Sequence, residues 1–319
     1  MREREVFSQN LKNWLHTAIL IGGMLLLVAV LGYALGGTTG LTWAVVIGAV
    51  LLFFSQRVSP QWVLNMYKAQ PIPQQQAPQL HRINELLAQR ANLANVPQLY
   101  YVPTKMMNAF AVGRRENAAI AVTDGLLRKL TMRELTAVLA HEMSHVQNND
   151  MRVMAFADVM SRVTNFFSTF GKVLLLVNLP LLLMGQATIS WFAVALLIFA
   201  PTIIGFLQLA LSRTREYDAD LDAMQLTGDP DGLISALKKL EHYQANMLRE
   251  MVRPGDGVPV PSVLRTHPHT DDRIRRLAAL TGRKLPQKPM PQPETAVLLP
   301  SQFQRVTRQP SWHMMGIWH

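Results

Sequence analysis

The stretch that decides the fold is TMRELTAVLAHEMSHVQ, residues 131–147. Thr131 with Glu134 three residues later forms a capping box, so a helix is predicted to begin here. His141 and His145 are four residues apart, so both imidazoles lie on one face of this helix and can reach one ion. The pattern HExxH on a capped helix therefore predicts a zinc site.

Glu142 directly follows the first histidine of the motif. A catalytic zinc site keeps one coordination position open, and water there has a pKa of about 7. A neighbouring glutamate can take the proton from this water and pass it to a leaving amine. Glu142 is therefore predicted to be the general base of a hydrolase.

Two histidines leave a catalytic zinc site short of one protein ligand. The segment REYDAD (215–220) contains Glu216 and Asp220, which are four residues apart and share one face of a helix. One carboxylate would bind the metal, and the other would hold the far nitrogen of an imidazole. The spacing alone leaves open which carboxylate does which.

Two long segments without Asp, Glu, Lys or Arg point to a membrane. Residues 13–56 form a run of 44 and residues 173–212 a run of 40, in a chain with only 16% charged residues. A membrane helix needs about 20 apolar residues, so each run predicts two transmembrane helices. The turns of the two hairpins are expected at 36–40 and 185–190.

Two alternatives to membrane helices fit these runs less well. A cleaved signal peptide has an apolar region of about 7–15 residues, which is shorter than the first run and is not followed by a second apolar segment. A buried helical hairpin of a soluble domain rarely extends for 40 residues without one charge. Both runs therefore favour lipid contact.

Charge placement predicts the orientation in the membrane. Lys and Arg mark the cytoplasmic side, and neither predicted hairpin turn carries a charge. Every charged segment then lies on one side, so the catalytic site is expected to face the cytoplasm. The net charge of +10 suits an anionic membrane surface. No aromatic-basic module suggests nucleic acid, and the chain has no cysteine.

Between the two runs, the pattern predicts a small α+β region. An amphipathic helix is expected over 80–94, after a Pro/Gln-rich linker at 71–79. Strands are expected at QLYYV (98–102), NAFAVG (108–113) and AAIAVT (118–123), the last two forming a hairpin.

The fold class is thus predicted to be α+β and mostly helical, with four transmembrane helices. An N-terminal transmembrane hairpin is expected at 1–60, followed by a first catalytic segment with the HExxH helix at 61–171. A second transmembrane hairpin is expected at 172–212, a second catalytic segment with the third zinc ligand at 213–285, and a flexible tail at 286–319.

Four motifs together resemble the HtpX family of membrane-bound zinc endopeptidases. They are HEMSH, SRTREYDAD (212–220), MNAFAVG (107–113) and THPHTDDRI (266–274). The resemblance covers roughly residues 1–280 in order and spacing. That family is related to prenyl-protein (CAAX) proteases and to mitochondrial quality-control metalloproteases.

The resemblance implies a zincin-like HExxH metalloprotease domain that holds one Zn²⁺ per chain. It implies that Glu216 is the third ligand, beside His141 and His145, and that Asp220 supports a ligand histidine. It also implies a multi-pass protein of the bacterial cytoplasmic (inner) membrane.

The resemblance further implies how substrate binds. Asn108, Ala109, Phe110 and Ala111 would form an edge strand along which the substrate backbone pairs. His267 would lie near the site and could steady a tetrahedral oxyanion.

The expected activity is hydrolysis of peptide bonds in polypeptides. The family resemblance implies that the substrates are misfolded or damaged membrane proteins and that the protein acts in quality control and stress response. One alternative is a prenyl-protein protease, for which more spans would be expected. A second is an inactive metal-binding scaffold, against which Glu142 argues. A third is a zinc transporter, but neither apolar run contains an acidic residue, and His16 is its only histidine candidate. The sequence carries no pattern that sets an oligomeric state.

Overall fold

The computed structural model describes most of the chain, namely residues 2–55, 59–186, 190–251 and 270–280. Within it the chain divides into two compact units. Unit 1 comprises Met1–Val58 and Arg152–Thr214, and unit 2 comprises Ser59–Met151 and Arg215–His319.

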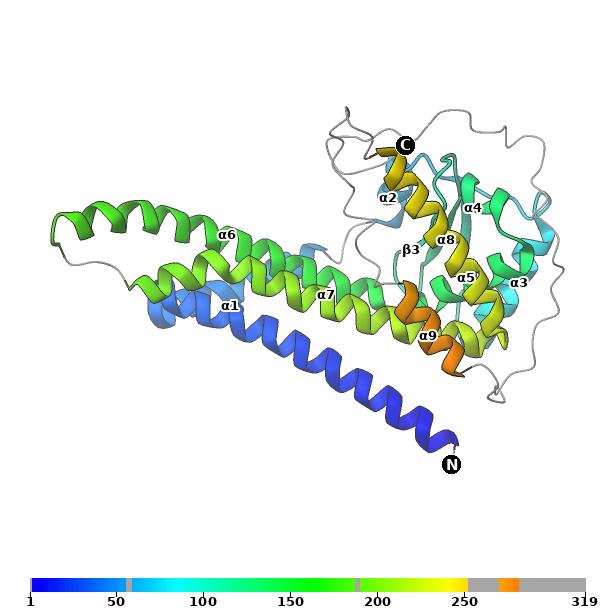
Figure 1. Ribbon diagram of the computed structural model, residues 1–319, viewed down its shortest axis with the longest axis horizontal. Helices are drawn as coiled ribbons and strands as arrows, with labels where there is room; N and C mark the ends of the chain where they lie inside the picture. Colours follow the sequence, from blue (N-terminus) through cyan, green and yellow to red (C-terminus); the bar gives the residue numbers. More distant parts are fainter. Residues whose placement is uncertain (1, 56–58, 187–189, 252–269, 281–319) are drawn as a thin grey trace. The chain divides into compact units, whose positions relative to one another are not determined.

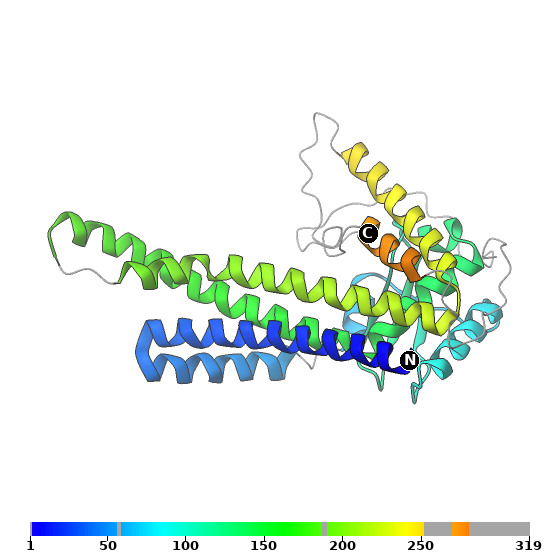
Figure 2. The same ribbon diagram turned by 60° about the horizontal axis from the view of Figure 1, so that its bottom comes forward.

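Unit 1 is built from long apolar helices. They are α1 (Arg2–Ser55), most of α6 (Asp150–Leu183) and the larger part of α7 (Trp191–Thr227). Figures 1 and 2 show α6 and α7 running antiparallel and side by side. The predicted turn between the charge-free halves of the second run is confirmed, since helix is interrupted between Leu183 and Trp191.

Helix α1 folds back on itself at a glycine pair. Gly36 and Gly37 leave the helical conformation, and Gly37 has φ +57°, a region that glycine enters without steric cost. A Cβ at Gly32 would lie 2.7 Å from the Cβ of Ala44, and one at Gly40 would overlap the carbonyl oxygen of Gly32. The two arms of α1 therefore touch backbone to backbone, as a hairpin.

Three helices among the described residues are long and apolar enough to cross a membrane: Leu15–Leu51, Asp150–Leu183 and Trp191–Thr227. The predicted count of four treats the two arms of α1 separately, and that count stays a prediction. Large apolar side chains cover the outside of unit 1; Leu176, Leu183 and Phe192 are more than 70% exposed. Such an apolar surface is typical of contact with lipid or another protein.

Helices α6 and α7 extend beyond the predicted hairpin at 172–212. Their charged ends continue the same helices into unit 2, and the five-segment division of the chain stays a prediction. Pro180 and Pro201 lie inside α6 and α7, where neighbouring helices in a membrane bundle tolerate them.

Unit 2 contains a four-stranded sheet in the order β1-β2-β4-β3. Its strands are β1 (Gln70–Pro71), β2 (Gln98–Val102), β3 (Ala109–Val112) and β4 (Ala119–Thr123). Strands β2 and β4 are parallel, and the other two pairs are antiparallel. The three predicted strands and the hairpin are confirmed.

Strand β1 was not predicted, because its sequence reads as part of the Pro/Gln-rich linker. Proline lacks the N–H of a ladder, so it is confined to sheet edges. Pro71 lies on such an edge: among the described residues, β1 pairs with β2 on one side only.

The remaining helices of unit 2 are α2 (Pro60–Met66), α3 (Pro78–Arg90), α4 (Asp124–Lys129), α5 (Met132–Gln147), α8 (Pro230–Met251) and α9 (Thr270–Leu280). Helix α5 begins at the predicted capping box: the Thr131 backbone N–H donates to Glu134 Oε2 at 2.8 Å. Leu135, Leu139 and Met143 of α5 are fully buried in the core of unit 2. The core thus fixes which face of α5 carries the histidines.

Candidate active site

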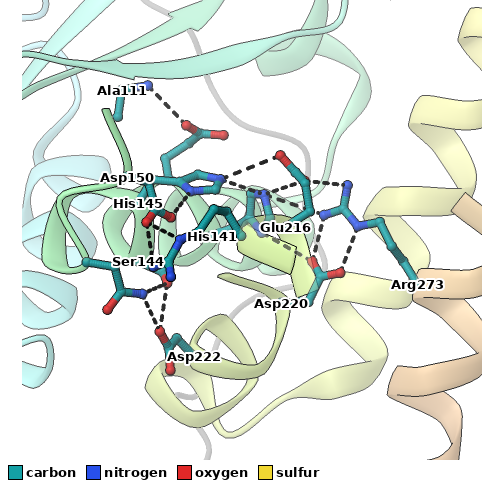
Figure 3. A network of polar contacts seen from close by, with 12 residues as sticks. Ala111, His141, Ser144, His145, Asp150, Glu216, Asp220, Asp222 and Arg273 are labelled. Carbon is teal, nitrogen blue, oxygen red and sulfur yellow. Dashed lines mark hydrogen bonds and ion pairs between the residues drawn. The ribbon is translucent and has the colours of Figure 1, made fainter. Parts of the chain in front are cut away.

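His141, His145 and Glu216 bring three metal-binding atoms together (Figure 3). Nε2 of His141 lies 3.3 Å from Nε2 of His145 and 3.4 Å from Oε2 of Glu216. Nε2 of His145 lies 3.8 Å from Oε1 of Glu216. The histidines come from α5 and the carboxylate from the part of α7 that belongs to unit 2.

This trio fits a zinc ion. Zinc in a tetrahedral site has bonds of about 2.0–2.2 Å, so its ligand atoms stand about 3.3–3.6 Å apart. The observed separations are close to this value, and all three ligand atoms lie within 4.8 Å of one another. Two imidazoles and one carboxylate are also a donor set of catalytic zinc, which keeps the fourth position open.

Burial and charge act against each other at His141, which is 6% exposed. Burial disfavours the charged imidazolium, but the nearby carboxylates of Asp220 and Glu216 outweigh it and raise the pKa of His141 to about 10. The two carboxylates thus hold a positive charge at this position in the metal-free protein. A bound metal ion would replace that proton.

Asp220 and Arg273 form a buried ion pair behind His141. Asp220 Oδ1 lies 3.2 Å from Nδ1 of His141, and Arg273 donates two hydrogen bonds of 2.7 and 2.6 Å to the Asp220 carboxylate. Burial alone would raise the pKa of Asp220, but the Arg273 guanidinium outweighs it and lowers that pKa. Arg273 Nη1 also lies 3.0 Å from Oε2 of Glu216. Arg273 is thus a buried cation that contacts both buried acids.

Asp150 holds the second histidine. Its Oδ2 lies 2.7 Å from Nδ1 of His145, and its Oδ1 accepts a hydrogen bond of 2.6 Å from Nε of Arg215. A carboxylate on the far nitrogen fixes the tautomer and the orientation of a ligand histidine. Asn149, with φ +55°, makes the turn between α5 and α6 that brings Asp150 back to His145.

A third carboxylate, Asp222, ties the end of α5 to α7. It accepts hydrogen bonds from Ser144 Oγ at 3.0 Å and from Asn148 Nδ2 at 2.7 Å. Burial raises the pKa of Asp222. Asp222 thus contacts the HExxH helix without touching either histidine (Figure 3).

Glu142 points at the edge strand of the sheet. Its Oε2 accepts a hydrogen bond of 3.0 Å from the backbone N–H of Ala111 in β3 (Figure 3). Because β3 pairs only with β4, its other edge is open in the described part of the chain. The expected general base therefore lies beside an open strand edge.

Backbone groups of β3 alternate between the two sides of the strand. Thr123 of β4 donates its N–H to the carbonyl of Asn108 at 3.1 Å, which identifies a hydrogen-bonded pair. By alternation Phe110 also bonds toward β4, whereas Ala109 and Ala111 direct their backbone groups away from it. Of the four residues predicted to bind substrate, these two present the outward groups.

A groove in unit 2 adjoins this edge. His141, Glu142 and Arg273 line one side of it, and Asn108 and Ala109 line another. Apolar side chains from α4, α5 and α8 complete its wall, namely Leu126, Val138, Leu233, Leu237 and Leu240. His267 and His269 lie outside the described residues.

The profile of peptidase family M48 matches residues 74–281, which contain both parts of the site. The chain belongs to peptidase family M48. Relatives agree: the protein named "Protease HtpX homolog" of Burkholderia ambifaria (strain MC40-6) is 36% identical over 293 residues, covering 85% of this chain and 99% of the relative. The homologue of Paraburkholderia phytofirmans is 36% identical over 290 residues with the same coverage.

Among solved structures, the crystal structure of S. mikatae Ste24p is similar to this chain, with a TM-score of 0.46 and 19% sequence identity. That match covers 86% of this chain and 66% of Ste24p.

Membership of peptidase family M48 confirms the predicted resemblance to HtpX and the predicted membrane metallopeptidase. The family implies a metal cofactor and peptide substrates.

Proposed function

We propose that the chain is a zinc-dependent endopeptidase in which His141, His145 and Glu216 bind one Zn²⁺ and Glu142 is the general base. The observation that carries this proposal is the closeness of the two histidine Nε2 atoms, 3.3 Å apart, to the Glu216 carboxylate, whose oxygens lie 3.4 Å from His141 and 3.8 Å from His145; these separations suit a tetrahedral ion. Asp220 and Asp150 support the two histidines from behind.

The residues of the site divide the chemistry among them. Zinc held by these three residues would supply Lewis acidity, which would acidify water and polarise a peptide carbonyl. Glu142 takes the proton from the attacking water at its carboxylate and donates it to the leaving amine. His267, from the family resemblance, remains a candidate for steadying the oxyanion.

Substrate is proposed to pair with the open edge of β3 as an added strand. The outward N–H and carbonyl of Ala109 and the outward carbonyl of Ala111 would provide the main-chain hydrogen bonds, since the N–H of Ala111 is bonded to Glu142. The adjoining groove, with three leucines from α8, would accept an apolar side chain near the scissile bond. An edge strand and an apolar pocket suit unfolded segments, in keeping with misfolded or damaged membrane proteins as substrates.

The orientation proposed for the protein places the site on the cytoplasmic side of a bacterial inner membrane. His145 and Glu216 belong to one site, so the chain between them must cross the membrane an even number of times. Helix α6 and most of α7 lie between them, and each helix is long and apolar enough to cross a membrane. Because α6 holds only 173–183 of the charge-free run, its crossing includes residues before Lys172. Both uncharged hairpin turns would then lie outside, at 36–40 and 185–190.

Cleavage of casein and of a membrane protein by the purified protein tests the proposed function. Both should be cleaved, a chelator should stop cleavage, and zinc should restore it. Cleavage confined to prenylated peptides would favour the prenyl-protein protease. A zinc-loaded protein that cleaves no polypeptide would favour the scaffold.

Cysteine labelling tests the orientation, because the chain has no cysteine of its own. Thr38→Cys and Gln186→Cys, both exposed positions, should react with an impermeant maleimide from outside the cell membrane. Gln74→Cys should react only after the membrane is opened. Outside labelling of Gln74→Cys would contradict the cytoplasmic site, and protection of Gln186→Cys with Thr38→Cys accessible would contradict two crossings by α6 and α7.

A further inference from the structure

Helix α6 carries a line of polar side chains along one exposed face. The spacing of these residues alternates between four and three, which keeps them on a single face of a helix. All five are exposed. We call this set the polar stripe: Asp158, Arg162, Asn165, Thr169 and Lys172.

The polar stripe lies beside the apolar part of α7. Gln208 Nε2 donates to Asp158 Oδ1 at 2.6 Å, and Ser168 Oγ donates to the carbonyl of Ile198 at 3.3 Å. These contacts set α6 against α7 along 191–212, a stretch without charge. At 1.5 Å per residue this stretch is about 33 Å long, the thickness of a hydrocarbon layer. The stripe therefore lies at membrane depth.

The two cations of the stripe have no ion-pair partner among the described residues. Arg162 and Lys172 are both exposed, whereas Asp158 already accepts a hydrogen bond from Gln208. Asn165 and Thr169 hydrogen-bond to carbonyls of their own helix. Charged side chains within membrane spans almost always face a protein partner or water, and they commonly mark substrate pathways.

We propose that the polar stripe is a lateral docking surface for a transmembrane segment of the polypeptide substrate that carries a carboxylate near the middle of the membrane. The proposal rests on the proposed endopeptidase function and names a substrate class for it. A carboxylate complements the charge of Arg162, and a guanidinium can bind it with two parallel hydrogen bonds. Phe166 and Phe170 flank the stripe, 53% and 45% exposed, and offer apolar contact to a helix.

Charge argues against two other occupants. In a two-fold dimer both copies have the same orientation in the membrane, so facing stripes would run parallel and set Arg162 against Arg162 and Lys172 against Lys172. Anionic lipid headgroups lie at the membrane surface, whereas Asp158 contacts Gln208, four residues inside the charge-free stretch, and Arg162 lies one helical turn further along, about 12 Å inside the layer. A substrate helix with an acidic side chain meets neither objection.

Photo-crosslinking tests the docking without requiring hydrolysis. The full chain with Glu142→Gln is reconstituted in vesicles, with a photo-reactive amino acid in place of Thr169. Model substrates share one cytoplasmic tail and one apolar span, with Glu, Leu or Lys at its centre. The Glu-bearing span should crosslink most strongly. The same photo-reactive residue in place of Phe199, 61% exposed on α7, is the control and should show no preference.

Cleavage of the common tail by the active protein supplies the second readout. A single interhelical polar contact changes stability in membranes modestly, so kcat/KM for the Glu-bearing span should exceed that for the Leu-bearing span by roughly 3- to 20-fold. Arg162→Glu should shift the preference to the Lys-bearing span, which a folding defect would not do.

Three results would overturn the docking surface: equal crosslinking and cleavage of all spans, crosslinks between two copies of the chain, or crosslinks to lipid alone. Failure of the proposed function is distinguishable, because then neither the tails nor casein would be cleaved while crosslinking would still report docking.

Discussion

The carboxylate of Glu142 and the backbone N–H of Ala111 are joined by a hydrogen bond of 3.0 Å. This bond connects the HExxH helix to the edge strand. Because the N–H of Ala111 faces away from β4, the contact needs no break in the sheet. The proposed general base and the proposed substrate strand are thereby held in one fixed relationship before any substrate binds.

Removing that N–H should slow the chemical step. Ala111→Pro deletes the donor, and the sheet should persist because proline is tolerated where its nitrogen faces away from the ladder. A hydrogen bond to a charged group contributes about 1.5–3 kcal/mol, so kcat should fall roughly 10- to 100-fold. Ala109→Pro is the matched control; it should act mainly on KM. Equal kcat values for the two variants would show that the contact does not position Glu142.

Glu216 and Asp220 should differ in their effect on zinc. Glu216→Ala should abolish stable metal binding, since it removes a proposed direct ligand. Asp220→Ala removes a contact to the far side of His141 and should weaken affinity about 10- to 100-fold. Competition titration against a chelator ranks the two variants. If Asp220→Ala proves the more damaging, the roles of the two carboxylates are reversed.

Asp150 should act on the metal through His145. Asp150→Asn weakens the acceptor at Nδ1 of His145, so zinc affinity should fall about 10- to 100-fold. Asp222→Asn is the matched control: it is a buried aspartate that contacts the same helix at Ser144. It should change thermal stability more than zinc affinity. Equal losses of affinity would mean that Asp150 merely stabilises the fold.

Glu134 should make stability depend on pH. Burial tends to raise its pKa, but hydrogen bonds from Lys239, Ser235 and the Thr131 backbone outweigh this and lower the pKa below 4.5. The stabilisation by Glu134 is therefore present above about pH 4.5 and is lost as pH falls through the folded pKa.

Glu134→Gln should accordingly lower Tm at neutral pH, by an amount corresponding to about 1–3 kcal/mol, and the gap should narrow below about pH 4. Thermal unfolding in detergent at several pH values measures this gap. Glu85→Gln, an exposed position on α3, is the control and should leave Tm nearly unchanged. A gap that stays constant with pH would rule out the charge of Glu134 as its cause.

Local patterns were enough to predict much of the fold. The capping box at Thr131 located the start of α5, and alternating apolar residues located β2 to β4. Both signals depend on neighbours in the chain. Strand β1 could not be predicted in this way, because its two residues acquire their structure only by pairing with β2.

The site was predictable where it follows helix periodicity and not where it depends on tertiary contact. His141, His145 and Glu216 lie in helical motifs, and the structure brings them together. Asp150 was missed because it reaches His145 through a turn at Asn149 rather than through helical spacing. Arg273 was missed although it lies within the THPHTDDRI motif; the need for a cation between Glu216 and Asp220 becomes evident only when the helices are packed.

A paired measurement on Glu142→Gln tests the proposed catalytic roles most directly: bound zinc and casein cleavage are determined in the same preparation. We expect about one zinc per chain, as in the unaltered protein, with cleavage reduced roughly 10²- to 10⁴-fold. A zinc-free variant would show that Glu142 is itself needed to hold the metal. A zinc-loaded variant that cleaves casein at the unaltered rate would contradict its role as the general base.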